Sequence, residues 1–135
     1  MVKILFYLLI FSALMCLLSV GGCSKYSEEV QSNLTKLKTT KSCSGCDLIG
    51  IEVVNYDLKN VDLSDAKLNG ANLSRVDLTE ANLTKANLTD ANLTDANLTD
   101  TNLVGAILAD AKLVNTNLSR VKLSHANING ADVSD

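Results

Sequence analysis

Apolar residues return at every fifth position, without interruption, from Cys46 to Asp135. Written in fives, the middle of this stretch reads A-N-L-T-K, A-N-L-T-D, A-N-L-T-D, A-N-L-T-D. Eighteen such units fill the 90 residues. The central position is Leu in fifteen of them, and the others have Val53, Ile128 and Val133. A repeat of this regularity has to be interpreted before any other feature of the chain.

A period of five residues fits neither an α-helix nor a flat β-strand. On a helix each residue turns by about 100°, so steps of five scatter the leucines around the whole surface. On a flat strand an odd step places successive leucines on opposite faces. A chain that turns a corner about every five residues points all of them at a common axis. The pattern therefore predicts a coil.

A second period, of twenty residues, indicates how many units close one turn. The position two residues before each central residue is Ala in ten of the eighteen units. Beyond the first twenty residues, the exceptions all fall in the third or fourth unit of a twenty-residue frame that starts at Cys46; they are Val76, Thr101, Thr116 and Val121. Four units per square turn would segregate the exceptions in this way. The 90 residues then make about 4.5 coils.

The A-[ND]-L-x-x units resemble the repeats of the pentapeptide-repeat proteins, over 90 of the 135 residues. Members of that family form right-handed quadrilateral β-helices, so the resemblance implies an all-β solenoid with that handedness and a square cross-section. The segment T-K-S-C-S-G-C-D-L, Thr40 to Leu48, resembles an opening motif of some members. Four units depart from the pattern where Asn or Asp is usual, at Lys67, Ile107, Lys112 and Lys122. An outward position accommodates all four.

Residues 1–22 have the pattern of a lipoprotein signal peptide. Lys3 is followed by an apolar run from Ile4 to Val20 that only two serines interrupt. The sequence from Leu18 to Cys23 resembles a bacterial lipobox, in which lipid is joined to the cysteine thiol and cleavage leaves that cysteine amino-terminal. We therefore expect lipid attachment at Cys23. The alternative is an uncleaved membrane anchor, because the apolar run can just span a bilayer.

Both alternatives place the remainder of the chain outside the cytoplasm, because Lys3 stays inside. We expect an exported protein of the bacterial cell envelope, anchored by lipid at the periplasmic face or the outer membrane. The acyl chains of a processed Cys23 are sufficient for stable anchoring, which one chain alone is not. Cys16 lies in the removed or membrane-embedded segment.

Residues 23–45 are expected to form a tether and an N-terminal cap with a short helix. Ser27 is a suitable N-cap, and apolar residues recur with the spacing of one helical face at Tyr26, Val30, Leu34 and Leu37. So short a helix needs a packing partner, and the first rung of the repeat is the nearest. A mobile tether is the alternative.

Cys43 and Cys46 form a C-x-x-C pair where the repeat begins. In an exported chain this spacing predicts a structural disulfide, with free or redox-active thiols as the alternative. A zinc site is not expected, because the chain offers no second cysteine pair and His125 lies far along the repeat.

The repeat favours a structural or protein-interaction module over an enzyme. A bore filled with leucine has no room for a nucleophile and base, and we expect neither cofactor nor metal. A rigid rod with flat sides suits contact with a protein partner, whose identity the sequence leaves unknown. Outward apolar residues cluster in one turn and form a candidate interaction patch at Val104, Ile107, Ala109 and Val114.

The last rung predicts self-association. The chain stops at Asp135, half a turn past a complete coil, without a capping helix. An uncovered rung exposes backbone groups and core side chains, which is a pairing hazard. We therefore expect an end-to-end homodimer through Ile128 and Val133.

The charge distribution does not indicate binding to nucleic acid. The formal net charge is −3, and the repeat carries 13 acidic and 7 basic residues. The resemblance implies one further alternative, since some pentapeptide-repeat proteins mimic DNA and bind gyrase. Basic residues break the stacked acidic rows, however, and export separates the chain from gyrase. Outward residues twenty apart are expected to stack, so that Asp65 faces Lys85, Arg75 faces Asp95, and Asp100 lies between Glu80 and Arg120. A solvated surface is the preferred interpretation of these charges.

Overall fold

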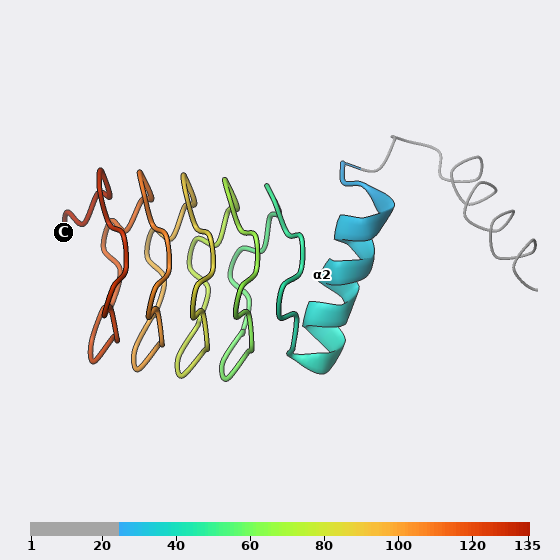
Figure 1. Ribbon diagram of the computed structural model, residues 1–135, viewed down its shortest axis with the longest axis horizontal. Coiled ribbons are helices and arrows are strands. Elements are labelled where there is room, and N and C mark those ends of the chain that lie inside the picture. The colour runs from blue at the N-terminus through green and yellow to red at the C-terminus, as the bar shows by residue number, and fades with distance from the viewer. Residues whose placement is uncertain (1–24) are drawn as a thin grey trace, which may run out of the picture.

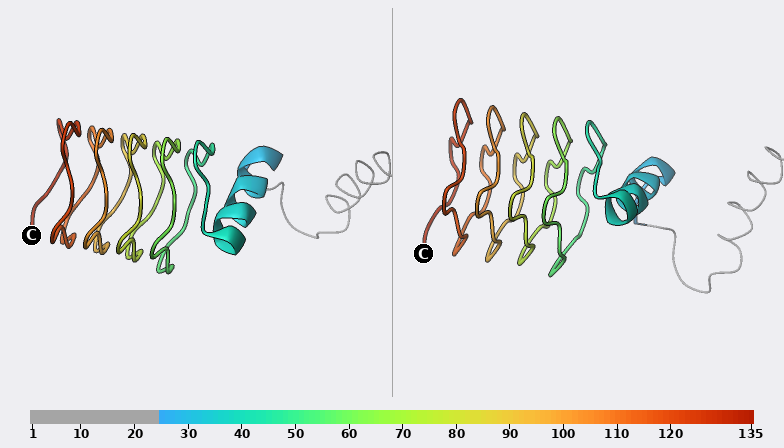
Figure 2. Two further views of the ribbon diagram at one scale, coloured as in Figure 1. Left: turned by 60° about the horizontal axis from the view of Figure 1, so that its bottom comes forward. Right: turned by 90° about the horizontal axis from the view of Figure 1, so that it is seen from below.

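The computed structural model describes residues 25–135; the predicted signal peptide, Cys16 and Cys23 lie outside the described residues. One helix occurs in the described part, α2, Glu28–Thr40. It is followed by a four-sided solenoid whose coils stack along one axis, with α2 at one end and the C-terminus at the other (Figures 1 and 2). Within residues 25–135, no helix has the length and hydropathy needed to cross a membrane.

Neighbouring coils pair through isolated parallel β-bridges, and residues 25–135 contain no longer strand. Every bridge joins residues twenty apart, from Ser42 with Asp62 to Lys112 with Asp132. The predicted twenty-residue turn is therefore confirmed. Pairing begins at Ser42, four residues before Cys46, so Cys43 occupies a central position of the coil rather than part of the cap.

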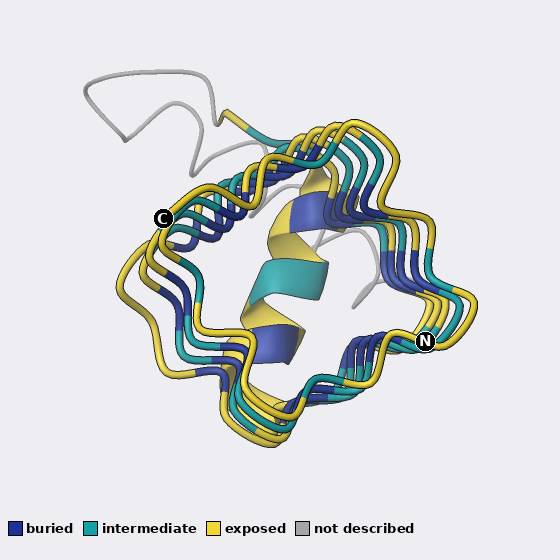
Figure 3. Ribbon diagram, turned by 90° about the vertical axis from the view of Figure 1, so that its left-hand side faces the viewer, coloured by how far each residue is buried: buried dark blue, intermediate teal, exposed yellow. Residues whose placement is uncertain are grey.

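Each unit of five residues forms one side of the square (Figure 3). We number the sides in chain order, beginning with residues 41–45 for side 1, 46–50 for side 2, 51–55 for side 3 and 56–60 for side 4. Each side recurs every twenty residues. Residues 41–60 are called the N-terminal coil below, and residues 116–135 the C-terminal coil.

The residue preference at each position of the repeat follows from the acceptor to which each backbone N–H donates. In the unit 81–85, the first N–H closes a turn onto the preceding central carbonyl, the second reaches the previous coil, and the third and fifth reach the next coil. The fourth, that of Thr84, donates to Asn82 Oδ1 at 3.2 Å. Thr84 Oγ1 donates to the same oxygen at 2.6 Å. Asn or Asp therefore satisfies an N–H that neither neighbouring coil accepts.

The first and fifth positions of a unit are fixed by space and by backbone conformation. First-position side chains face the interior, so Ala86 is fully buried. Thr101 is accommodated there because its Oγ1 donates to Leu78 O at 2.8 Å. Fifth-position residues make the corner in the left-handed region, with φ of 59° at Glu80 and 62° at Gly70. That conformation costs little for Gly and more for other residues.

The central side chains fill the bore. The largest fully buried side chains of the described residues are Leu37 of α2, Ile51, and the central leucines from Leu48 to Leu98. None of the buried polar side-chain atoms of residues 25–135 lacks a hydrogen-bond partner. The buried central side chains therefore form an apolar column along the axis.

One of the three stacked pairs of opposite charge is in contact. Arg120 donates from Nε to Asp100 Oδ1 at 2.7 Å and from Nη2 to Oδ2 at 2.6 Å, and this guanidinium holds the pKa of Asp100 below its usual value. Among the ion pairs of residues 25–135, neither Asp65 with Lys85 nor Arg75 with Asp95 appears. Lys85 leans toward the following coil instead, since a Cβ added at Gly105 would lie 3.4 Å from Lys85 Cγ.

Candidate functional site

The bore, filled with side chains, leaves the ends and the outer sides as candidate sites, and the two ends differ. At the N-terminal end α2 lies across the square opening (Figure 3). Val30 and Leu37 are buried against the core, and Tyr26 and Leu34 are partly buried against it. The predicted short helix is present and packs on the first rung.

Polar contacts from α2 and from Tyr26, just before it, also satisfy backbone groups at the edge of the N-terminal coil. Asn33 Nδ2 donates to Asp47 O at 3.0 Å, and the N–H of Glu52 donates to the Tyr26 hydroxyl at 2.9 Å. An edge whose backbone groups are taken up in this way is protected from pairing with another chain. The helix itself is capped by Ser27, whose Oγ accepts from the N–H of Val30 at 3.3 Å.

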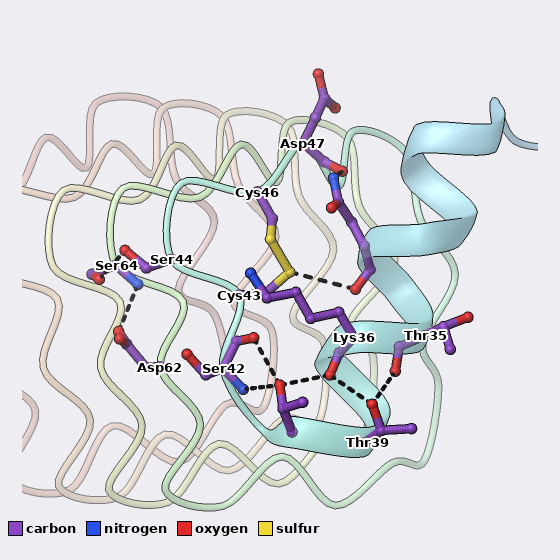
Figure 4. Close-up of a disulfide and its surroundings, with 12 residues drawn as sticks. Thr35, Lys36, Thr39, Ser42, Cys43, Ser44, Cys46, Asp47, Asp62 and Ser64 are labelled. Carbon is purple, nitrogen blue, oxygen red and sulfur yellow. Dashed lines mark hydrogen bonds between the residues drawn. A yellow bond between two sulfur atoms is a disulfide. The ribbon is translucent and has the colours of Figure 1, made fainter. Parts of the chain in front are cut away.

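Beneath α2, a disulfide joins Cys43 and Cys46 across the corner between sides 1 and 2 (Figure 4). Cys43 is a central residue and Cys46 the first residue of the next unit, so both side chains are buried. Cys43 Sγ lies 3.4 Å from Asn33 O. Because a disulfide sulfur carries no hydrogen, this approach is a packing contact. The bridge thus lies inside the coil, against the helix.

Tyr56 is the residue at this end that the sequence patterns missed. It stands at a first position, where the other units from Cys46 to Ala111 bury the side chain, yet Tyr56 is 36% exposed. The corresponding turn hydrogen bonds are present at Ile51 and Val61, while among the described residues none joins the N–H of Tyr56 to Val53 O. Lys38 Nζ of α2 lies 5.4 Å from the centre of the tyrosine ring. An aromatic residue at a position where the repeat usually has alanine was the sequence signal that could have identified Tyr56.

The C-terminal coil leaves its apolar interior uncovered. Ile128 and Val133, the predicted dimer residues, are 51% and 56% exposed. Two further central residues, Leu118 and Leu123, are 36% and 39% exposed, although their counterparts in middle coils are fully buried. Together the four make one complete turn of core side chains that are exposed at the C-terminal end of the solenoid. The twenty-residue period was the signal that all four belong to one surface.

The predicted outward patch is divided among three sides. Ile107 and Ala109 share side 2, Val104 lies on side 1, and Val114 on side 3. Ile107 is 38% exposed, and the other three are half-buried. Val104 and Ala109 stand at the two corners that bound side 2, and Ile107 lies between them, so a flat partner on that side can meet these three at once.

The shifted carboxylates belong to the corner motif rather than to a cleft. Hydrogen bonds from the side chain and backbone of Ser64 lower the pKa of Asp62, and Ser134 does the same to Asp132. Within residues 25–135, no group of three or more His, Cys, Asp or Glu side chains is placed to hold a metal ion. These carboxylates organise corners of the coil.

Comparisons with known proteins agree with this geometry. The family profile described as Pentapeptide repeats matches eight copies, over residues 42–79, 57–95, 71–108 and 101–135. No protein of curated function matches the chain.

Three solved structures are informative. A pentapeptide-repeat protein of the cyanobacterium Cyanothece 51142 is 27% identical with a TM-score of 0.65, and the match covers 78% of this chain and 99% of that chain. A pentapeptide-repeat protein of the Arabidopsis thaliana thylakoid lumen is 34% identical with a TM-score of 0.53, covering 67% and 60%. HetL of Nostoc sp. strain PCC 7120, involved in heterocyst differentiation regulation, is 31% identical with a TM-score of 0.52, covering 75% and 46%.

The profile match over residues 42–135 and the stacked four-sided coils agree. The chain therefore belongs to the pentapeptide-repeat family, whose members form right-handed quadrilateral β-helices.

Proposed function

We propose that this chain is a lipid-anchored, non-enzymatic interaction module of the bacterial cell envelope, and that its C-terminal coil binds a second copy of itself. The uncovered apolar end of that coil carries the proposal. The family assignment supports it, since pentapeptide-repeat proteins are generally structural or interaction modules. The lipid anchor rests on the Leu18 to Cys23 sequence.

The anchor is tested by metabolic labelling with palmitate. The full-length chain is expected to incorporate label and to fractionate with membranes. Cys23→Ala should abolish the labelling, whereas Cys16→Ala should leave it unchanged, because only Cys23 follows the lipobox residues. Label retained in the Cys23→Ala chain, or absent from the unaltered chain, would refute lipid attachment at this residue.

The proposed dimer is supported by backbone geometry as well as by the exposed side chains. In the interior coils the N–H of each central residue donates to the next coil, as Leu98 does to Asn117 O at 2.9 Å. The equivalent N–H groups of Leu118, Leu123 and Ile128 form no hydrogen bond among the described residues. Apolar side chains ringed by unpaired backbone donors and acceptors form a surface suited to edge-to-edge pairing.

The asymmetry of the ends limits the assembly to two copies. Because α2 covers the N-terminal edge, a second chain cannot stack head to tail on it. The C-terminal end can pair only with the C-terminal end of another copy, which is a closed two-fold contact rather than a growing fibre.

Sedimentation across a range of protein concentrations tests the dimer. The unaltered chain and Ile107→Lys are expected to dimerise, because Ile107 lies on an outer side. Ile128→Lys should stay monomeric, because it places a charge at the centre of the contact. A monomer at every concentration, or a dimer unaffected by Ile128→Lys, would show that this end is not the interface.

Redox signalling through Cys43 and Cys46 is the alternative for the N-terminal end. Burial of both sulfurs supports a static structural role, since reactive cysteines are partly exposed. Thiol titration of the native chain distinguishes the two. Two thiols that react without denaturation after mild reductant would support the redox role.

Mimicry of DNA by the acidic outer sides is the second alternative. Ion pairs such as Lys59 with Asp77, 3.1 Å apart, interrupt the acidic columns and support the envelope proposal instead. Strong inhibition of gyrase supercoiling by the purified chain would reverse this preference.

A further inference from the structure

The N-terminal coil carries an apolar edge that the proposed function does not use. Ile49, Val54 and Tyr56 are 48%, 38% and 36% exposed. Ile49 and Val54 stand at the two corners that bound side 3, and Tyr56 lies just past the second corner. Twenty residues on, the places of Ile49 and Val54 are taken by Asn69 and Ser74. The apolar edge thus does not continue into the coil that follows, and apolar residues return to these two columns only at Ala109 and Val114.

The described chain starts at this same edge. Lys25 forms an ion pair with Glu52 of side 3, and Tyr26 binds the Glu52 N–H through its hydroxyl. These contacts fix the first described residues against side 3 of the N-terminal coil. Cys23 precedes Lys25 by two residues, and two residues reach at most about 7 Å. A lipid on Cys23 would therefore be attached within about 7 Å of Lys25, the residue that pairs with Glu52 on side 3.

The chemistry of the edge suits the surface of a bilayer. Tyr26 and Tyr56 are the only aromatic residues in the described part of the chain, and both lie at this end. Tyrosine is favoured at membrane–water interfaces, where its ring is buried and its hydroxyl is solvated. Lys38, whose Nζ lies over the Tyr56 ring, can keep its charge among the headgroups while its methylenes contact apolar atoms.

We propose that the edge formed by Ile49, Val54 and Tyr56 lies on the lipid surface and holds the solenoid in one orientation, with the C-terminal coil directed away from the membrane. This inference rests on the lipid anchor of the proposed function. Tethering raises the local concentration of the edge at the bilayer, so a contact too weak to bind a free domain is enough to orient an anchored one.

The charges around the edge are largely balanced. Lys25 pairs with Glu52, and Lys41 Nζ lies 4.0 Å from Asp57 Oδ1. The contact is therefore apolar in character, and we expect it to be insensitive to anionic lipid and to salt.

Tryptophan quenching in vesicles tests the orientation with a control on the same side. The chain contains no tryptophan. Val54→Trp and Val114→Trp both alter the fourth position of side 3, three coils apart, or about 14 Å along the axis. The full-length lipidated variants are reconstituted into vesicles of phosphatidylcholine with or without brominated acyl chains. Emission of Val54→Trp is expected to fall about twofold with brominated lipid, because interfacial side chains lie roughly 5–10 Å into the headgroup boundary. Emission of Val114→Trp should not change.

A second substitution separates contact from mere proximity. In the Val54→Trp chain, Tyr56→Asp should abolish the quenching, whereas Ile107→Asp on the far coils should leave it unchanged. Far-ultraviolet circular dichroism verifies that each variant retains its coil.

The outcomes distinguish the two proposals. A chain that does not float with the vesicles refutes the anchor and the contact together. The oriented contact is refuted, and the anchor is not, if the chain floats with the vesicles and gives one of three results. These are equal emission in both lipids, equal quenching at both positions, or quenching that survives Tyr56→Asp.

Discussion

Substituting a core leucine with alanine, once in a middle coil and once in the C-terminal coil, measures how much the neighbouring coils bury each side chain. Leu83 and Leu123 are both central residues of side 1, two coils apart. Leu83 is fully buried, and Leu123 is 39% exposed at the open end. Leu83→Ala leaves a cavity between intact coils and should lower the free energy of unfolding by about 3–4 kcal/mol. Leu123→Ala loses a smaller transfer energy and leaves no closed cavity, so we expect a loss of roughly 1–1.5 kcal/mol.

Urea unfolding followed by circular dichroism at low micromolar protein measures both losses, with the denaturant slope checked for constancy. The measurement then bears on the dimer. At concentrations where two copies associate, Leu123 is covered by the partner, and the cost of Leu123→Ala should rise with protein concentration while that of Leu83→Ala does not. Equal losses at the lowest concentration would refute the reading of the C-terminal coil as an uncovered end.

Three further predictions concern the corners and the cap. Glu80→Gly should raise the free energy of unfolding by about 1 kcal/mol, because glycine adopts the left-handed backbone of this corner without strain. Gly50→Ala should lower it by a similar amount, because Gly50 has a φ of 64° and the added Cβ, which meets no atom within 4 Å, gains no contact that offsets the strain. Thermal melts measure both effects, and a destabilised Glu80→Gly would contradict the argument. The pKa of Asp62 is lowered in the folded state, so its contribution to stability is present above the unfolded pKa near 4 and is lost as pH falls through the folded pKa. Asp62→Asn should therefore reduce the loss of folding stability below about pH 4, as measured by denaturation at several pH values. Reducing the Cys43–Cys46 disulfide, which closes a loop of only a few residues, should lower the free energy of unfolding by about 2 kcal/mol. Unfolding curves with and without reductant measure this loss, and identical curves would show that α2 alone stabilises the N-terminal cap.

The sequence predicted the architecture because its two periods are direct consequences of the coil. A leucine every fifth position requires a corner every five residues, and the segregated alanine exceptions require four corners per turn. Neither inference depends on distant contacts, so both could be made from composition and spacing. The short helix at Ser27 was predictable for the same reason, since its cap and apolar face are local.

The features that the sequence did not predict depend on where individual side chains point. Lys85 stands twenty residues from Asp65 but leans toward the next coil, so register alone did not establish that ion pair. Tyr56 occupies an interior position in the repeat and leaves it because its ring is too large. Cys43 looked like part of the cap, because the unit to which it belongs lacks both the alanine and the leucine of the motif.

The constant separation of twenty residues between paired positions has a consequence for insertions and deletions. Losing one whole unit between coils keeps every leucine directed at the axis, but it rotates everything downstream by a quarter turn. Deleting one unit between Asp100 and Arg120, for example, would bring Arg120 beside Asp95 instead. The columns of surface side chains are thus reassorted while the core is preserved. A protein of this kind can therefore acquire a new outer surface through the loss or gain of one unit, while its fold and core stay the same.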